Sequence, residues 1–276
     1  MNLPNPSIMG VVNATPDSFS DGGRFLDVDA GVAHALKLAE DGADILDIGG
    51  ESTRPGAKPV SLEEERARIM PIIEKLVVET NAVISVDTRK PELASDAVKA
   101  GAAIWNDVSA LTFAGDSLDV AADLSCDIVL MHAQGDPRTM QDDPSYDDVV
   151  EEVYAFLAAR IDACVKAGVD ESRLIVDPGI GFGKTLANNL SLLANLGRFR
   201  DLGCPVLLGA SRKRFIAALD RNAPVDQRLG GSLAAVLEGF RQGANIFRVH
   251  DVVETRQALK IAWAFKDAME KPGFGR

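Results

Sequence analysis

Three residues that can hydrogen-bond to a flat ring each end a short apolar run of the sequence. Asp87, Asn106 and Asp177 follow runs that have the composition of buried strands. In a partly dry cavity, two carboxylates and an amide suit a heterocycle with several N–H donors, such as a pterin or a purine. Either carboxylate alone could instead cap the loop after its strand, and both interpretations stay open at this point.

A second set of residues suits an anion. Arg248 and His250 lie two positions apart at the end of the last apolar run, so both side chains face the same side of a strand. They would bind phosphate or pyrophosphate, although a surface salt bridge is the alternative for Arg248. Asn13 ends the first apolar run, and its neutral oxygen is a ligand that Mg²⁺ accepts beside phosphate oxygens and water.

Ser211, Arg212 and Lys213 form a third polar set, which follows another apolar run and opens a short predicted helix. Backbone donors at the start of the helix, together with the two cations, would favour a phosphate or a carboxylate. His132 also ends an apolar run. We expect it to shape the same region rather than to bind metal, because no Cys/His spacing supports a zinc site.

The segment 174–184 runs from apolar residues through Asp177 into a glycine-rich loop that ends at Lys184. It matches neither of two common phosphate motifs. Pro178 stands where a Walker A loop needs glycine, and Lys184 stands where the dinucleotide fingerprint needs its third glycine. Arg54 and Lys184 are basic loop residues that could reach a ligand held here, but Lys184 could equally be a solvated charge.

These polar residues lie at the ends of eight apolar runs, each the start of a predicted strand–helix unit. Strict alternation of strand and helix predicts a parallel sheet, and eight units in 276 residues favour a closed (β/α)8 barrel over an open sheet. We therefore expect one α/β barrel domain over residues 1–276. The carboxyl ends of its strands would meet at one mouth, where the capping residues are Asn13, Asp47, Asp87, Asn106, His132, Asp177, Ser211 and His250.

The bulk composition limits the classes of partner. The net charge of −12 argues against binding to nucleic acid, whose phosphates would be repelled. The three cysteines are far apart, which indicates core packing in a reducing compartment. The first six residues lack a basic segment, and no apolar run reaches the ~18 residues of a membrane span. We therefore expect a cytoplasmic protein without a signal peptide.

Several of these segments together resemble dihydropteroate synthases, from Met9 to Val252. The resemblance rests on the motifs at 9–23, 49–56, 86–88, 106–108, 131–135, 177–184, 211–213 and 248–252, each at a strand end and in the same order as in that family. It implies a TIM barrel that condenses 6-hydroxymethyl-7,8-dihydropterin pyrophosphate with para-aminobenzoate. The products would be dihydropteroate and pyrophosphate, in folate synthesis.

The resemblance also implies roles for individual residues. Asp87, Asn106, Asp177 and Lys213 would hold the pterin, and Arg248 and His250 the pyrophosphate. Asn13 would carry Mg²⁺. The aminobenzoate pocket would be formed by Thr53, Arg54, Pro55, Phe182 and Ser211 as the loops 14–23 and 49–56 close. Asp87, Lys213 and Arg54 would be the catalytic residues.

One departure from the family pattern is Arg214, which stands where many members have serine near the aminobenzoate carboxylate. The family expectation for assembly is a homodimer. Two other functions stay open from the sequence: a pterin-binding methyltransferase barrel, and a barrel that binds a pterin or phosphate without turnover. The first would have no use for the two early loops or for an anion site at Arg248 and His250. The second is disfavoured by the intact set of Asn13, Arg54, Lys213 and Arg248.

Overall fold

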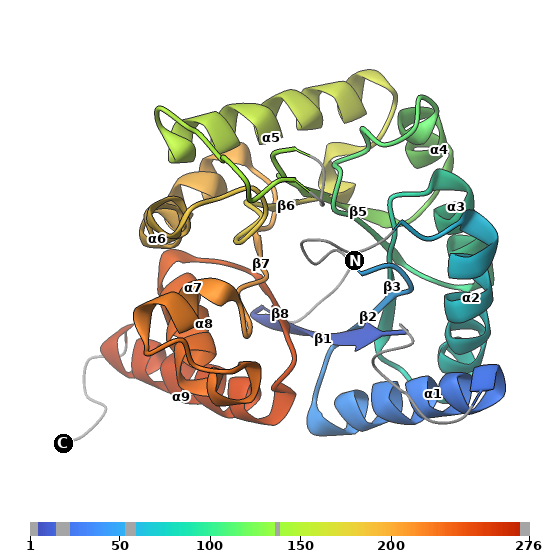
Figure 1. Ribbon diagram of the computed structural model, residues 1–276, viewed down its shortest axis with the longest axis horizontal. Coiled ribbons are helices and arrows are strands. Elements are labelled where there is room, and N and C mark those ends of the chain that lie inside the picture. The colour runs from blue at the N-terminus through green and yellow to red at the C-terminus, as the bar shows by residue number, and fades with distance from the viewer. Residues whose placement is uncertain (1–4, 15–22, 53–58, 136–138, 271–276) are drawn as a thin grey trace.

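The fold was analysed in a computed structural model, which describes residues 5–14, 23–52, 59–135 and 139–270. Eight parallel strands form a ring, with helices packed around its outside (Figure 1). The strands are β1 (Ser7–Asn13), β2 (Ile45–Gly49), β3 (Val83–Asp87), β4 (Ile104–Asp107), β5 (Asp127–Met131), β6 (Leu174–Asp177), β7 (Leu207–Leu208) and β8 (Ile246–Val249). This confirms the predicted (β/α)8 barrel.

Strands pair in the order β6-β5-β4-β3-β2-β1-β8-β7. The ring closes between β6 and β7 through an isolated bridge that joins Val176 to Val206. We refer to this closure as the β6–β7 seam. It is the thinnest junction of the ring within the described residues, because β7 has only two residues in its ladder.

The helices are α1 (Gly23–Asp41), α2 (Leu62–Glu79), α3 (Pro91–Ala100), α4 (Ser117–Asp123), α5 (Val149–Lys166), α6 (Leu186–Ala194), α7 (Arg214–Leu219), α8 (Leu229–Gln242) and α9 (Val252–Glu270). Short 3-10 helices lie at Glu171–Arg173, Leu196–Leu202 and Val225–Gln227. The helix α6 ends at Ala194, where both the backbone and the side chain of Asn195 donate to the Ser191 carbonyl, at 3.1 and 2.9 Å.

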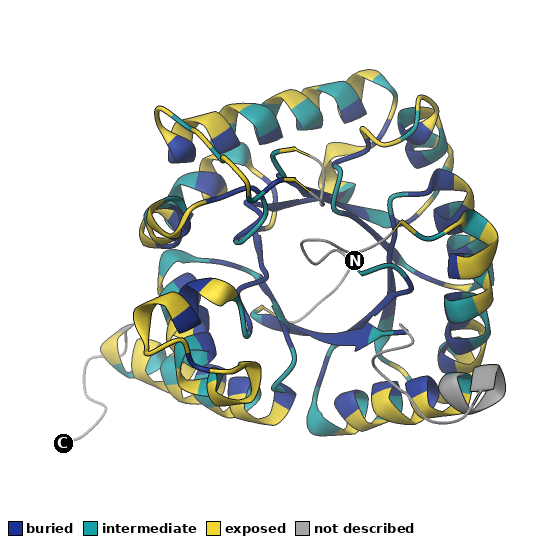
Figure 2. Ribbon diagram, in the orientation of Figure 1, coloured by how far each residue is buried: buried dark blue, intermediate teal, exposed yellow. Residues whose placement is uncertain are grey.

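Apolar side chains fill the barrel in a layer below the mouth. Seven strands each contribute one buried residue to this layer, and Val83 of β3, which is partly buried, packs against it. The seven residues are Met9, Ile45, Ile104, Val129, Ile175, Leu207 and Ile246. A second core lies between the strands and the helices, whose outer faces are exposed (Figure 2). Cys126, Cys164 and Cys204 are all buried and unpaired, as predicted. None of the helices within the described ranges has the length and apolar character of a membrane span.

Register sets the height of the polar strand ends. Asn13 pairs with Gly49, Gly49 with Asp87, and Asp87 with Asn106, so these four positions form one row across β1 to β4. A Cβ atom on Gly49 would lie 3.3 Å from that of Asp87, tighter than most Cβ contacts. Glycine at this point therefore lets the Asp87 side chain lean over the neighbouring strand.

Candidate active site

The mouth of the barrel holds an ion-pair cluster centred on Arg248. Its Nε donates to Asp47 Oδ2 at 2.6 Å, and Nη2 donates to Asp87 Oδ2 at 2.7 Å. Asn106 donates to the same Asp47 oxygen at 3.1 Å. The structure thus links Arg248, which we expected beside His250 at an anion site, to Asp87 and, through Asp47, to Asn106. The pair at Arg248 is not the surface salt bridge that was its alternative, because 25% of the Arg248 side chain and none of the Asp47 side chain is exposed.

Asp47 is a site residue whose role the sequence did not reveal. It accepts from Ser85 Oγ at 2.6 Å as well as from Arg248 and Asn106, and so orients groups from three other strands. We had counted it only as one of the strand ends. The signal available in the sequence was an acid between Leu46 and Ile48, inside an otherwise apolar strand, where a buried carboxylate needs partners.

Burial and charge act in opposite directions in this cluster. Burial raises the pKa of Asp87, Arg248 lowers it, and Asp47 raises it again, with a net upward shift. Burial alone would lower the pKa of Arg248, but Asp47 and Asp87 outweigh that effect and the pKa is raised. The guanidinium therefore stays charged and favours the ionised form of Asp87. Its Nη1 has no hydrogen bond among the described residues and can serve an anion.

Asp177 and Lys213 form a second cluster across the β6–β7 seam. Asp177 Oδ1 accepts from Gly179 N at 2.7 Å, so this carboxylate does cap its loop with one oxygen, as its alternative interpretation required. A Cβ atom on Gly209 would lie 3.8 Å from Asp177 Oδ2, 3.9 Å from Lys213 Nζ and 3.9 Å from Arg248 Cβ. The three side chains therefore converge around Gly209.

Lys213 is surrounded by groups that favour a planar ligand. Its ammonium donates to the Ile180 carbonyl and lies 4.6 Å from the centre of the Phe182 ring. Burial lowers the pKa of Lys213 to about 8, although Asp177 acts against this shift. The structure thus brings Phe182 to Lys213, which converges with Asp177 beside Gly209.

Ser211 and His250 contact each other at the ends of β7 and β8. Ser211 Oγ lies 3.1 Å from His250 Nδ1 and accepts from the His250 backbone N–H at 3.2 Å. Arg212, which we expected beside them at an anion site, has a different position. Its guanidinium pairs with Asp251, with 3.0 Å between Nε and Oδ2, and its backbone adopts a left-handed conformation (φ 56°).

Lys184 is buried, with 2% of its surface exposed, and is not the solvated charge that was one of its two interpretations. It contacts His132, whose pKa burial lowers to about 3, so this histidine stays neutral. Within the described ranges no cluster of His, Cys, Asp and Glu side chains could hold a metal ion. The expected part of His132 in shaping the mouth agrees with its position, where it packs edge-on to Phe156.

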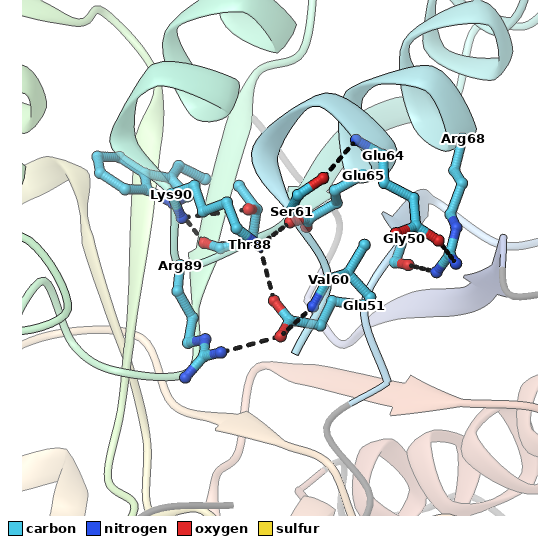
Figure 3. Close-up of polar contacts among 11 residues, drawn as sticks. Gly50, Glu51, Val60, Ser61, Glu64, Glu65, Arg68, Thr88, Arg89 and Lys90 are labelled. Atoms are coloured by element: carbon cyan, nitrogen blue, oxygen red, sulfur yellow. Dashed lines mark hydrogen bonds and ion pairs between the residues drawn. The ribbon is translucent and has the colours of Figure 1, made fainter. Parts of the chain in front are cut away.

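A charge cluster that sequence reasoning missed joins the ends of β2 and β3 (Figure 3). Glu51 accepts from Arg89 and from Lys90, both at 2.9 Å, and Lys90 also pairs with Glu65 of α2. Burial raises the pKa of Glu65, while Lys90 acts against this shift. The partners are too far apart in sequence for local pattern to connect them. The cluster braces the two strand ends that carry Gly49 and Asp87.

Asn13 lies half-buried at the end of β1, in the row of strand ends that contains Asp87. Thr53, Arg54 and Pro55, and most of the loop 14–23, lie outside the described residues. Arg214 is exposed at the start of α7. Carboxylates and amides for a ring, cations for an anion and one candidate Mg²⁺ ligand therefore share one mouth.

Comparison with known proteins gives the same assignment. Residues 9–250 match the family described as pterin binding enzyme. Dihydropteroate synthase from Escherichia coli (strain K12) is 46% identical over 270 residues, which cover 98% of this chain and 95% of the relative. Dihydropteroate synthase from Haemophilus influenzae is 45% identical, with 97% of each protein covered.

Solved structures of such enzymes superpose over nearly the whole chain. Xanthomonas albilineans dihydropteroate synthase with 4-aminobenzoic acid has a TM-score of 0.90 and 53% identity, over 95% of this chain and 93% of that one. The same enzyme in complex with 7,8-dihydropteroate has a TM-score of 0.88 and 50% identity, over 96% and 95%. The chain therefore belongs to the pterin-binding enzyme family and, within it, to the dihydropteroate synthases.

Proposed function

We propose that the barrel mouth condenses 6-hydroxymethyl-7,8-dihydropterin pyrophosphate with para-aminobenzoate. A C–N bond forms between the aniline nitrogen and the pterin methylene, the methylene C–O bond breaks, and pyrophosphate leaves. The observation that carries this proposal is the convergence of Asp87, Asp177, Lys213 and Arg248 from both sides of the mouth. Purified protein with both substrates and Mg²⁺ should release pyrophosphate and dihydropteroate in equal amounts. Pyrophosphate release without dihydropteroate would contradict the proposal.

The pterin is held by groups that match its edge. The Asp177 carboxylate accepts from ring N–H groups, and the Asn106 amide can accept from or donate to ring nitrogens. The Lys213 ammonium donates to a ring acceptor. One oxygen of Asp177 is occupied by Gly179 and the other lies near Gly209. This division lets a single carboxylate shape its own loop and still bind a ligand.

Asp87 and Arg248 divide the charge that develops during the reaction. Loss of pyrophosphate leaves positive charge on the pterin methylene, which the Asp87 carboxylate stabilises. Negative charge on the leaving group is stabilised by Arg248 and His250. The aniline is a weak base, yet it attacks such a cation without a strong general base, and its proton passes to solvent or to the departing anion.

Asn13 fits Mg²⁺ as a single protein ligand. A half-buried amide oxygen beside a pyrophosphate site is sufficient, because Mg²⁺ retains waters and takes most of its other ligands from phosphate. When bound, the ion would neutralise the leaving pyrophosphate. Asn13 would orient that assembly from the end of β1.

Asn13→Ala is expected to lower kcat by about 10- to 100-fold, because an interaction with the departing charge is lost. The affinity for a pterin without pyrophosphate should change less than about twofold, since Asn13 does not contact the ring. Steady-state kinetics and calorimetric titration with that pterin measure the two effects. Equal losses in both would contradict the assignment.

Arg214→Ser is expected to raise the KM for para-aminobenzoate less than about fivefold and to leave the pterin KM unchanged. Arg214 is exposed, and exposed charge pairs contribute little to affinity. Ser211, which is buried, would then serve the aminobenzoate carboxylate. Kinetics at fixed pterin pyrophosphate test this, and a rise above about tenfold would make the guanidinium a direct ligand.

A homodimer is part of the proposed function, and α9 offers a surface for it. Ile261, Phe265 and Met269 are 52%, 66% and 78% exposed, and they are spaced four residues apart on one side of the helix. Ile261→Glu is expected to raise the dimer dissociation constant by roughly 100-fold or more, as measured by sedimentation. Val78→Glu on α2, where Val78 is 81% exposed, serves as the control. A monomeric parent protein at micromolar concentration would exclude the dimer.

A further inference from the structure

The loop after β6, residues 178–185, is held in one shape by glycines and by contacts between loop backbones. Gly179, Gly181 and Gly183 have φ values of 67°, 86° and 59°, in the left-handed region. A Cβ atom on Gly179 would lie 1.9 Å from the His132 carbonyl oxygen, and one on Gly183 would lie 2.4 Å from the Gln134 carbonyl oxygen. This segment, called here the β6 loop, therefore lies directly against the loop after β5.

Lys184 fastens these two loops from inside. Its Nζ donates to the Phe182 carbonyl at 2.9 Å and to the His132 carbonyl at 3.3 Å, and lies 2.9 Å from His132 Nδ1. An ammonium has three N–H donors, and three acceptors surround this one. Two further side chains hold the same loop: Gln141 donates to the Gly181 carbonyl at 2.6 Å, and Tyr146 donates to the Gly183 carbonyl at 2.8 Å.

The β6 loop in turn positions two groups at the mouth. The Ile180 carbonyl accepts from Lys213, and the Phe182 ring faces the same ammonium. Lys184 itself is buried behind them, so it does not meet a substrate directly. It can act on the reaction only by fixing the loop that carries Phe182.

We propose that Lys184 is a positioning residue for the aminobenzoate subsite and acts through Phe182. The inference rests on the proposed function, in which Phe182 forms one wall of that subsite. A neutral, apolar side chain at 184 would remove the donor from two buried acceptors on His132 and from the part-buried Phe182 carbonyl, and would loosen the loop. Displacement of a binding wall by a fraction of an ångström weakens the ligand held against it.

The test compares Lys184→Met, Phe182→Ala and the double variant in steady-state kinetics. Lys184→Met is expected to raise the KM for para-aminobenzoate about tenfold and that for the pterin pyrophosphate less than about threefold. The double variant should match Phe182→Ala within about a factor of two, because the lysine acts through the ring. Effects that multiply in the double variant would overturn the inference.

The possible results distinguish failure of this inference from failure of the proposed function on which it rests. If Phe182→Ala raises the aminobenzoate KM and Lys184→Met leaves it unchanged, only the role of Lys184 is overturned. If Phe182→Ala leaves it unchanged, the subsite assignment fails and the inference fails with it. If Lys184→Met does not fold, Tyr146→Phe serves as the second test. It is expected to raise the KM for para-aminobenzoate about threefold, and an unchanged KM would overturn the inference.

Arg173→Met is the matched control. Arg173 donates to the carbonyls of Cys126 and Ala121 at 2.8 and 3.2 Å, so its loss also removes side-chain bonds to backbone, but near the amino ends of β5 and β6. It should lower the melting temperature and leave both KM values unchanged. If Lys184→Met likewise lowers the melting temperature and leaves both KM values unchanged, its effect is only structural and the inference is overturned.

Discussion

Asp87→Asn is expected to lower kcat by about 10²- to 10³-fold while the protein remains folded. The substitution keeps the shape of the side chain and removes its negative charge, which would otherwise stabilise the positive pterin methylene. Arg248 lies 2.7 Å from Asp87 Oδ2 and favours the ionised carboxylate against the effect of burial. Loss of one such electrostatic contact in a water-poor site costs about 3–4 kcal/mol of transition-state stabilisation. Rapid-quench measurement of dihydropteroate formation would separate this step from product release.

Asp107→Asn is the control for that experiment. Asp107 is a fully buried carboxylate at the end of β4, but its oxygens accept from the backbone of Ser109 and Leu111 at 2.7 and 2.9 Å. The substitution Asp107→Asn should lower the free energy of unfolding by about 1–3 kcal/mol and change kcat less than about threefold. Similar kcat losses in the two variants would mean that Asp87 acts only by supporting the fold.

Lys213→Met is expected to lower kcat/KM for the pterin pyrophosphate by about 10- to 150-fold, the range for loss of a hydrogen bond from a charged donor. Lysine at 213 is already tied to Ile180 and faces the Phe182 ring, so it reaches the ligand without losing further side-chain freedom. Lys213→Arg should recover part of the loss, because the charge returns with a different shape.

The same residue should impose an alkaline limit on activity. Burial lowers the pKa of Lys213 to about 8, so the ammonium is present below that pH and is lost as the pH rises through it. The kcat/KM for the pterin should therefore fall above pH about 8. Asp177 and Arg248 face Lys213, and Lys184, whose pKa burial lowers to about 7, titrates nearby. In Lys213→Arg, the part of the alkaline decrease in kcat/KM that comes from titration of residue 213 should disappear. An unchanged pH profile of kcat/KM would show that Lys213 is not the group responsible.

The sequence predicted the barrel because each strand is a short apolar run that stops at a polar residue. Asp87, Asn106 and Asp177 could be placed at one mouth by counting such units, with no knowledge of their contacts. The helix α4 was missed, since seven residues are too few for a periodic apolar pattern. By contrast, the cap at the start of α2 is local: Ser61 accepts from the Glu64 backbone only three residues away, a spacing that a sequence pattern can show.

Contacts between distant residues could not be predicted. Arg248 and Asp47 are separated by 201 positions, and nothing local shows that a guanidinium and a buried carboxylate will meet. Lys184 looked like an ordinary loop lysine, because its burial depends on the loop after β5 folding over it. Such partners are fixed by the closure of the barrel, which local patterns describe only as an order of strands.

The β6–β7 seam has a consequence for the cooperativity of the barrel. One isolated bridge closes the ring there, so local opening at the seam costs less free energy than opening at a full ladder. Asp177 lies at the end of β6, on one side of the seam, and Lys213 follows β7, on the other side. A pterin bound by both spans the gap, and its binding free energy adds to the cost of opening. A bound substrate should therefore link the two sides of the seam, and amide hydrogens beside Val176 and Val206 are expected to exchange more slowly when the site is filled.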